Sequence, residues 1–124
     1  MVGKKKGLER IEDRTYRFAL RVVRLVSAMP RNKVADVLGR QVLRAATSVG
    51  ANVEEAIAAS SKRDFANKMQ IALKEARETH YWLRLIRDAE IFADERMAPI
   101  IQEALETKKI LSATVKTTRA SLNA

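Results

Sequence analysis

Apolar residues recur along most of the chain at steps of three and four, the spacing that places side chains on one face of an α-helix. The first such stripe predicts a helix over about residues 12–28. Its members are Ile11, Thr15, Phe18, Val22, Leu25 and Met29. Because a proline disfavours helical backbone in the residue before it, Pro30 keeps Met29 out of the helical region and ends this helix.

A second helix is predicted from an N-cap at Asn32 to about residue 59. Its stripe consists of Val34, Leu38, Val42, Ala45, Val49, Asn52, Val53, Ala56 and Ile57. Gly39 and Gly50 fall inside this pattern, and each lowers helix propensity by up to ~1 kcal/mol. We interpret both glycines as sites where a neighbouring helix approaches closely.

Two further helices complete the pattern. The third begins with Ser61, which forms a potential capping box with Asp64, and continues to about residue 90. Its stripe is Phe65, Met69, Ala72, Ala76, Thr79, Leu83 and Ile86. The fourth is expected to start from a cap at Asp94 and to reach about residue 121, with a stripe of Met97, Ile101, Leu105, Leu111, Val115 and Leu122. Pro99 must lie in its first turn or kink it, and the pattern does not decide which.

Four helices of about 17 to 28 residues with short connections favour antiparallel neighbours. The predicted fold is therefore all-α, an antiparallel up-and-down four-helix bundle. Residues 11–124 form its single domain, and residues 1–10 are expected to be a flexible basic tail.

Composition narrows the classes of function. The chain has no cysteine, which excludes disulfides and thiolate metal sites and favours a reducing cytoplasm. No apolar run reaches the ~20 residues that span a bilayer, so no membrane role is expected. The net charge is +9, and residues 1–44 carry twelve Lys and Arg against four Asp and Glu. A positive field concentrated on one region attracts polyanions.

Arginines at positions 14, 17, 21 and 24 repeat along a face of the first helix that differs from its apolar stripe. We predict that they contact a nucleic-acid backbone together with other basic residues of this region. The full predicted set is Lys4, Lys5, Lys6, Arg10, Arg14, Arg17, Arg21, Arg24, Arg31, Lys33 and Arg40. A salt-bridging role between subunits and a plain solvated face remain alternatives. Few aromatics are available to stack bases, so base recognition is not expected.

A polar line of Gln41, Ser48, Asn52 and Glu55 follows the second helix. It could hold a ligand or a metal in the bundle, but a hydrogen-bonded seam that fixes the register between helices or subunits is favoured. Arg44 is expected to extend this structural seam toward Glu75 and Glu78 of the third helix.

The sequence contains no recognisable set of catalytic residues. His80 is the only histidine, and no Glu stands three residues before it, so the Glu-x-x-His pairs of a di-metal bundle are absent. Ser48 or Ser61 would lack a convincing base, and no glycine-rich phosphate loop occurs. We predict no enzyme activity, no cofactor and no metal.

Tyr81, Trp82 and Leu85 lie beside the apolar stripe of the third helix and give that helix a second apolar face. A helix that is apolar on two faces is usually covered on both. The simplest cover is another subunit, so we predict that these three residues form an oligomer contact.

Two long segments, residues 41–56 (QVLRAATSVGANVEEA) and 71–85 (IALKEARETHYWLRL), resemble the bacterial four-helix-bundle family that includes the 23S rRNA intervening-sequence proteins. Residues 18–20, 61–62 and 64–65 extend the resemblance, which covers about residues 16–89. It implies an up-and-down bundle that assembles into a ring, a pentamer. A distant relative, the accessory protein of diversity-generating retroelements, is a basic pentamer that binds nucleic acid and a reverse transcriptase, and serves here only as an analogy.

Two hypotheses follow. The first is a basic homo-oligomer that binds RNA or DNA backbone through its arginine-rich surface. The second is an assembly scaffold that binds a protein client through the same surface, with no direct nucleic-acid role.

Overall fold

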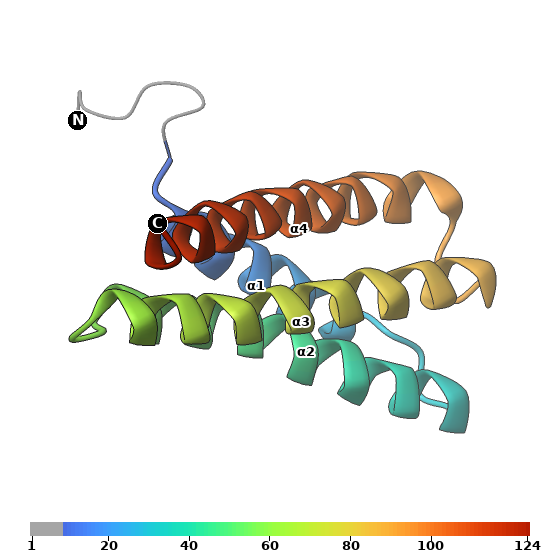
Figure 1. The fold of residues 1–124 in the computed structure, drawn as a ribbon. Helices are drawn as coiled ribbons and strands as arrows, with labels where there is room; N and C mark the ends of the chain where they lie inside the picture. Colours follow the sequence, from blue (N-terminus) through green and yellow to red (C-terminus); the bar gives the residue numbers. More distant parts are fainter. Residues whose placement is uncertain (1–8) are drawn as a thin grey trace.

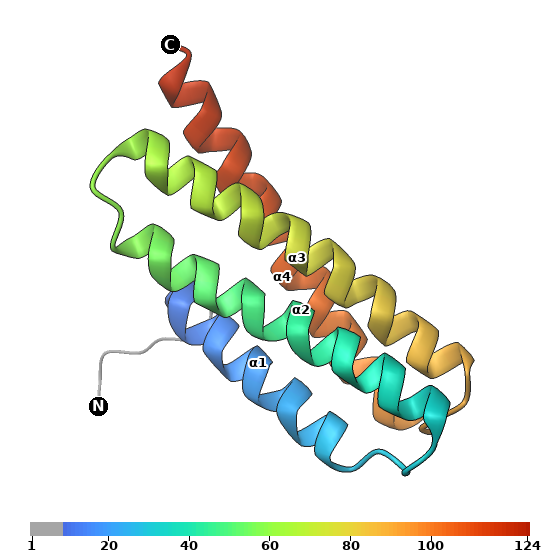
Figure 2. The same ribbon diagram turned by 90° about the horizontal axis from the view of Figure 1, so that it is seen from below.

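The computed structural model describes residues 9–124, which form four α-helices that run alternately up and down (Figure 1). They are α1 (Ile11–Ser27), α2 (Lys33–Ile57), α3 (Lys62–Asp88) and α4 (Asp94–Leu122). Contacts are densest between α2 and α3 and fewest between α1 and α4. The view from below shows α1 beside α2, on the side away from α3 (Figure 2). The predicted up-and-down four-helix bundle is confirmed.

Local side-chain chemistry sets where the helices begin. The Asn32 Oδ1 atom accepts a hydrogen bond from the Ala35 N–H at 2.9 Å, and the Ser61 hydroxyl accepts one from the Asp64 N–H at 3.0 Å. Both predicted caps are therefore confirmed. The cap predicted at Asp94 is wrong by one residue, because Ala93 is the N-cap and Asp94 is the first helical residue. As the first helical residue, Asp94 places its negative charge near the positive end of the helix dipole, which is favourable, but its side chain does not cap the helix.

The core divides into two hydrophobic clusters, one toward each end of the bundle. Three buried threonines, Thr15, Thr79 and Thr107, lie at the boundary between them. Thr15 and Thr79 donate to carbonyl groups of their own helices, those of Ile11 and Glu75. Within residues 9–124, the Thr107 hydroxyl is the one fully buried side-chain polar atom without a hydrogen-bond partner. The middle of the core is thus its most polar layer.

The stripe predicted for α4 is partly wrong. Met97 and Leu111 are buried as expected, but Ile100, Ala104 and Thr107 are buried in place of Ile101 and Leu105, which are only half-buried. Successive steps of four rotate by about 40° per step away from the core, whereas alternating steps of three and four stay on it. Pro99 lies inside α4 beyond the first turn, and since it has no N–H, the Glu95 carbonyl lacks its usual helical partner.

In α2, two predicted core residues are exposed: Val34 lies in the first turn and Ile57 is the last helical residue. The two glycines differ from each other. A Cβ atom at Gly39 would come within 3.0 Å of the Met29 sulfur, which confirms a close approach there. At Gly50 the nearest atom, the Thr15 carbonyl oxygen, would be at 3.5 Å, an ordinary contact.

Candidate nucleic-acid interface

The arginine stripe of α1 faces α4, and its first member is held there by two acids. The Arg14 guanidinium donates to both carboxylate oxygens of Glu103, at 2.9 and 3.1 Å, and to Glu106 at 2.8 Å. The hydrogen bond to Glu103 raises the pKa of Arg14 above its ordinary value. Glu103 is only 11% exposed, so the pair joins α1 to α4 across a partly buried contact.

Arg17 is also paired. Its guanidinium donates to Glu9 at 2.6 and 3.1 Å, and this pairing raises the pKa of Arg17. Arg14 and Arg17 are therefore both paired with acids of the protein itself. A contact of these two arginines with nucleic acid stays a prediction, and it would have to compete with these ion pairs. Glu103 and Glu106 lie on α4, and Glu9 lies just before α1. The spacing of residues within α1 alone could not predict that these acids pair with the arginine stripe.

Arg21 and Arg24, one and two turns further along, lie in a different environment. With Arg96 of α4 they line an open cavity of about 230 Å³ between the two helices, floored by Leu25 and Ile100. Within residues 9–124, no carboxylate oxygen lies within 4.0 Å of any of these three guanidinium groups. We call Arg21, Arg24 and Arg96 the arginine cleft.

Arg96 was not among the predicted binding residues, although the antiparallel register explains its place. Arg14 lies opposite Glu103, so moving seven residues up α1 to Arg21 and seven residues down α4 leads to Arg96. Its guanidinium lies 4.6 Å from the centre of the Phe92 ring, a cation–π contact. The sequence does contain a signal for this placement: Arg96 stands seven residues before Glu103, the acid that pairs with Arg14.

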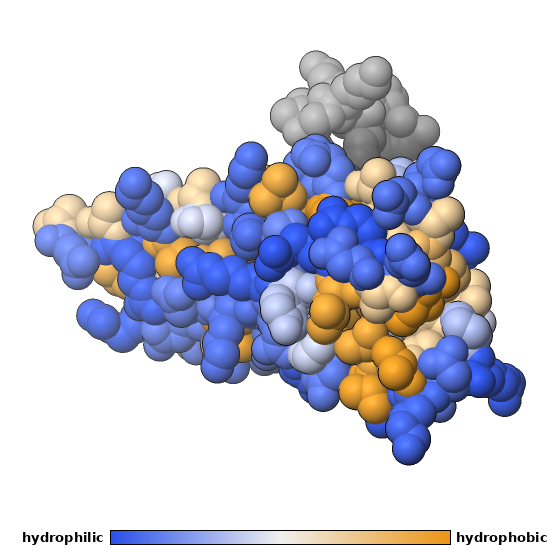
Figure 3. Space-filling model, turned by 90° about the vertical axis from the view of Figure 1, so that its right-hand side faces the viewer, coloured by the Kyte–Doolittle hydropathy of each residue, from blue (hydrophilic) through white to orange (hydrophobic). Residues whose placement is uncertain are grey.

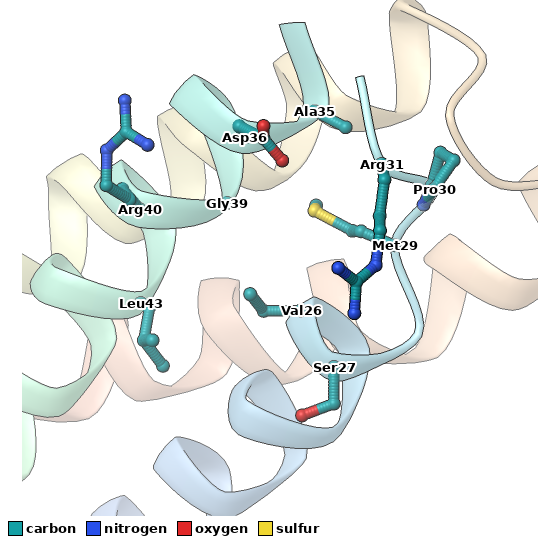
Figure 4. Close-up of a pocket in the computed structure, with 10 residues that line it drawn as sticks. All are labelled: Val26, Ser27, Met29, Pro30, Arg31, Ala35, Asp36, Gly39, Arg40 and Leu43. Carbon is teal, nitrogen blue, oxygen red and sulfur yellow. The ribbon is translucent and has the colours of Figure 1, made fainter. Parts of the chain in front are cut away.

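The other predicted basic residues do not join this cleft. Arg31 and Arg40 line a separate cavity of about 330 Å³ between the end of α1 and α2, which Asp36 also lines (Figure 4). Figure 4 shows the Met29 side chain lying across this cavity toward Gly39. Lys33 is exposed at the start of α2, and Arg10 is exposed and lies 3.8 Å from Glu12. Lys4, Lys5 and Lys6, and most of the predicted tail, lie outside the described residues.

The predicted polar seam lies on the outer side of the α2–α3 pair. Arg44 binds Glu75 at 3.2 Å and also binds Glu78, so it bridges the two helices, and a long hydrogen bond of 3.5 Å joins it to Gln41. The Asn52 amide donates to the Ser48 carbonyl group within α2. Glu55 is exposed and has no hydrogen bond or ion pair among the described residues.

His80 lies against α4, where its Nδ1 atom is 3.2 Å from the Lys108 ammonium group. Burial lowers the pKa of His80, and the nearby positive charges of Lys108, Arg84 and Arg87 lower it further. Since a lysine can only donate, the imidazole accepts this bond as a neutral ring. In residues 9–124, no three His, Cys, Asp or Glu side chains are grouped as metal ligands, and no helix is long and apolar enough to cross a membrane.

The predicted oligomer contact is exposed in part. Tyr81 is 50% exposed and Leu85 is 36% exposed, on the outer surface of α3. Trp82 packs edge-on against Tyr81, with ring centres 5.0 Å apart, but its indole also packs on the core and donates to Glu78. Val37 of α2, which is 43% exposed, lies on the same side as the Arg44 bridge. We call Tyr81 and Leu85 the α3 patch.

A second apolar surface, which was not predicted, lies on the outer side of the α1–α2 pair. Tyr16, Leu20 and Val23 follow one another at helical steps and are 68%, 37% and 38% exposed. Figure 3 shows hydrophobic residues gathered on the side of the molecule where α1 and α2 lie. Within this surface lies a cavity of about 270 Å³, which we call the α1–α2 groove. It is lined by Tyr16, Ala19, Thr47, Gly50, Ala51 and Glu54.

A family model described as "23S rRNA-intervening sequence protein" matches residues 10–113, which is most of the chain. The chain belongs to this family. The match confirms the predicted resemblance and extends it over α1 and most of α4. No functionally curated protein matches this family member.

This family member is also similar to a solved structure, that of a protein of unknown function from the S23 ribosomal protein family of Bacteroides thetaiotaomicron. The two chains are 39% identical and superpose with a TM-score of 0.80. The similarity covers 86% of this chain and 99% of the other.

Proposed function

We propose that this family member is a non-enzymatic, basic homo-oligomer, a pentamer, that binds the backbone of RNA or DNA through an arginine-rich surface in the cytoplasm. The observation that carries the proposal is the arginine cleft, in which three guanidinium groups from two helices line one open cavity without a carboxylate partner among residues 9–124. Like charges gathered in this way repel one another unless an anion lies between them. Phosphate fits the cleft because guanidinium groups bind it with two parallel hydrogen bonds.

The chemistry of the surface favours the backbone over the bases. Phe92 is half-buried beneath Arg96, and Tyr16 and Tyr81 lie on other surfaces of the bundle. In the part of the chain that the structure describes, no aromatic side chain lines the arginine cleft for a base to stack on. Binding through phosphate contacts alone is electrostatic, tolerant of sequence and strongly dependent on salt.

Binding of a labelled RNA hairpin and of a DNA duplex, measured over a range of salt concentrations, tests the proposal. The affinity should fall steeply with salt, and the Arg21→Gln/Arg24→Gln variant should bind more weakly. Its plot of log affinity against log salt should be flatter by about 2 for each contacting subunit, about 1 for each phosphate contact removed.

The matched control is Arg63→Gln/Lys116→Gln, which removes the same charge from exposed positions of α3 and α4. Lys116 lies 20 residues beyond Arg96, about 30 Å along α4. The control should keep the slope of the wild-type protein. Equal losses in both variants would show a diffuse charge effect and would contradict the proposal. Undiminished affinity in both variants, without salt dependence, would contradict binding through phosphate contacts. No binding of either nucleic acid by the wild-type protein would favour the protein-scaffold hypothesis.

A further inference from the structure

The molecule carries two apolar surfaces that are different from each other and lie on different helices. The α1–α2 groove has a floor of small residues, Ala19, Gly50 and Ala51, with an exposed aromatic ring at Tyr16. The α3 patch, in contrast, projects two large side chains, Tyr81 and Leu85, from a single helix. One surface is hollowed and the other protrudes.

The charges around the two surfaces are opposite. Glu54 lines the groove and has no basic group within 4.0 Å among residues 9–124. On α3, the Arg84 guanidinium lies over the Tyr81 ring, 6.0 Å from its centre. Among residues 9–124 no carboxylate oxygen lies within 4.0 Å of it, although its charge also acts on Asp88 at longer range. The protruding surface is therefore basic at its edge, and the hollowed surface is acidic.

We infer that the two surfaces bind each other between copies of this chain: Tyr81 of one copy enters the α1–α2 groove of the next, and Arg84 pairs with Glu54. This inference rests on the self-association in the proposed function and names the surfaces that carry it. The contact is heterologous, so each copy uses its groove for one neighbour and its α3 patch for another. Pairing of each surface with itself would instead bring like charges together.

The absence of cysteine in the chain makes a direct test possible. Two variants, Ala51→Cys in the groove and Arg77→Cys one turn before Tyr81, each carry a single thiol at an exposed position. With a short bismaleimide, a mixture of the two should give a cross-linked dimer, and each variant alone should give none. Cross-linking of either variant alone, or of neither the single variants nor the mixture, would overturn the inference.

A charge exchange gives an independent readout. The Glu54→Arg variant faces Arg84 with a like charge, so its mass in solution should fall toward that of a single chain. The double variant Glu54→Arg/Arg84→Glu should restore the mass of the wild-type assembly. As the matched control, Glu55→Arg makes the same change one residue along, on the α2–α3 side, and should leave the mass unchanged.

The outcomes separate the inference from the proposed function. A wild-type assembly of several chains that neither cross-links in the mixture nor responds to Glu54→Arg would retain the self-association and refute these two surfaces. A single-chain mass for the wild-type protein would refute both. Binding of nucleic acid is measured separately and does not enter either readout.

Discussion

Each arginine of the α1 stripe has a role that depends on which acid lies within its reach. Arg14 is clamped by Glu103 and Glu106, Arg17 is paired with Glu9, and Arg21 and Arg24 have no acid partner among residues 9–124. Four positions that look equivalent in the sequence therefore divide into a structural half and an available half. Spacing along one helix predicts the shared face, but the register of α4 and the position of Glu9 before α1 decide how the stripe divides.

Replacement of Arg14 by Ala should lower the free energy of unfolding by about 1.5–3 kcal/mol, because hydrogen bonds to charged groups contribute that much and Glu103 stays largely buried without its partner. Urea denaturation at neutral pH measures the change.

Arg17→Ala is the matched comparison, since Arg17 is 49% exposed and its ion pair with Glu9 is open to solvent. It should cost about 0–1 kcal/mol. Equal losses in the two variants would show that the Arg14 contact does not hold α1 to α4.

At the scale of the helix, the sequence predicts that each helix exists, and two of the N-caps, better than it predicts which residues of α4 are buried. Asn32 and Ser61 are local signals, because a cap needs only its own first turn, and both were predicted correctly. The stripe of α4 was misassigned at Ile101 and Leu105 because a small rotational error accumulates at each step. Tyr16, Leu20 and Val23 recur at helical spacing as a second apolar stripe of α1. The α1–α2 groove beside them was not predicted, because a groove depends on how α1 packs against α2.

Replacing Gly50 by alanine tests whether α1 needs a glycine at this position in order to pack against α2. A Cβ atom there would meet the Thr15 backbone at an ordinary distance, and alanine is the better helix former. Gly50→Ala should therefore raise the free energy of unfolding by roughly 0.5–1 kcal/mol.

Thermal denaturation in the Glu54→Arg background gives the cleanest value, because association then contributes little to stability. A lower free energy of unfolding in Gly50→Ala would mean that α1 can pack here only against a residue without a side chain.

The contact of His80 with Lys108 should make the α3–α4 pair sensitive to acid. Burial and Lys108 hold the pKa of His80 below its ordinary value of 6.5, so the unfolded chain binds the proton more readily than the folded chain. The contribution of His80 to stability is therefore complete above pH 6.5, and stability should fall as the pH drops through 6.5 toward the lower pKa of the folded state, by at most about 1.4 kcal/mol per pH unit for one group.

Chemical denaturation at several pH values tests this expectation, with His80→Asn as the control. The variant should show a flatter profile over the same interval, above the range in which carboxylates titrate. Identical profiles would show that the histidine does not carry the effect.

At the scale of the whole molecule, the described surface carries an arginine-lined side and two apolar sides. The arginine cleft lies between α1 and α4, the groove between α1 and α2, and the patch on α3. Composition alone predicted that the protein would be basic and would associate, because the charge excess and the second apolar face of α3 are visible in the sequence. It could not predict which charges remain unpaired or that a second apolar surface faces another side, since both depend on how the helices pack.

We propose that the protein works as an assembly of identical bundles, in which neighbouring copies cover the exposed apolar surfaces and several arginine clefts act together. Light scattering on the purified wild-type chain, free of nucleic acid and in moderate salt, tests it most directly. We expect a single species whose mass is a multiple of 14.0 kDa, with five copies if the proposed pentamer forms. A uniform species of 14.0 kDa over the micromolar range would contradict it.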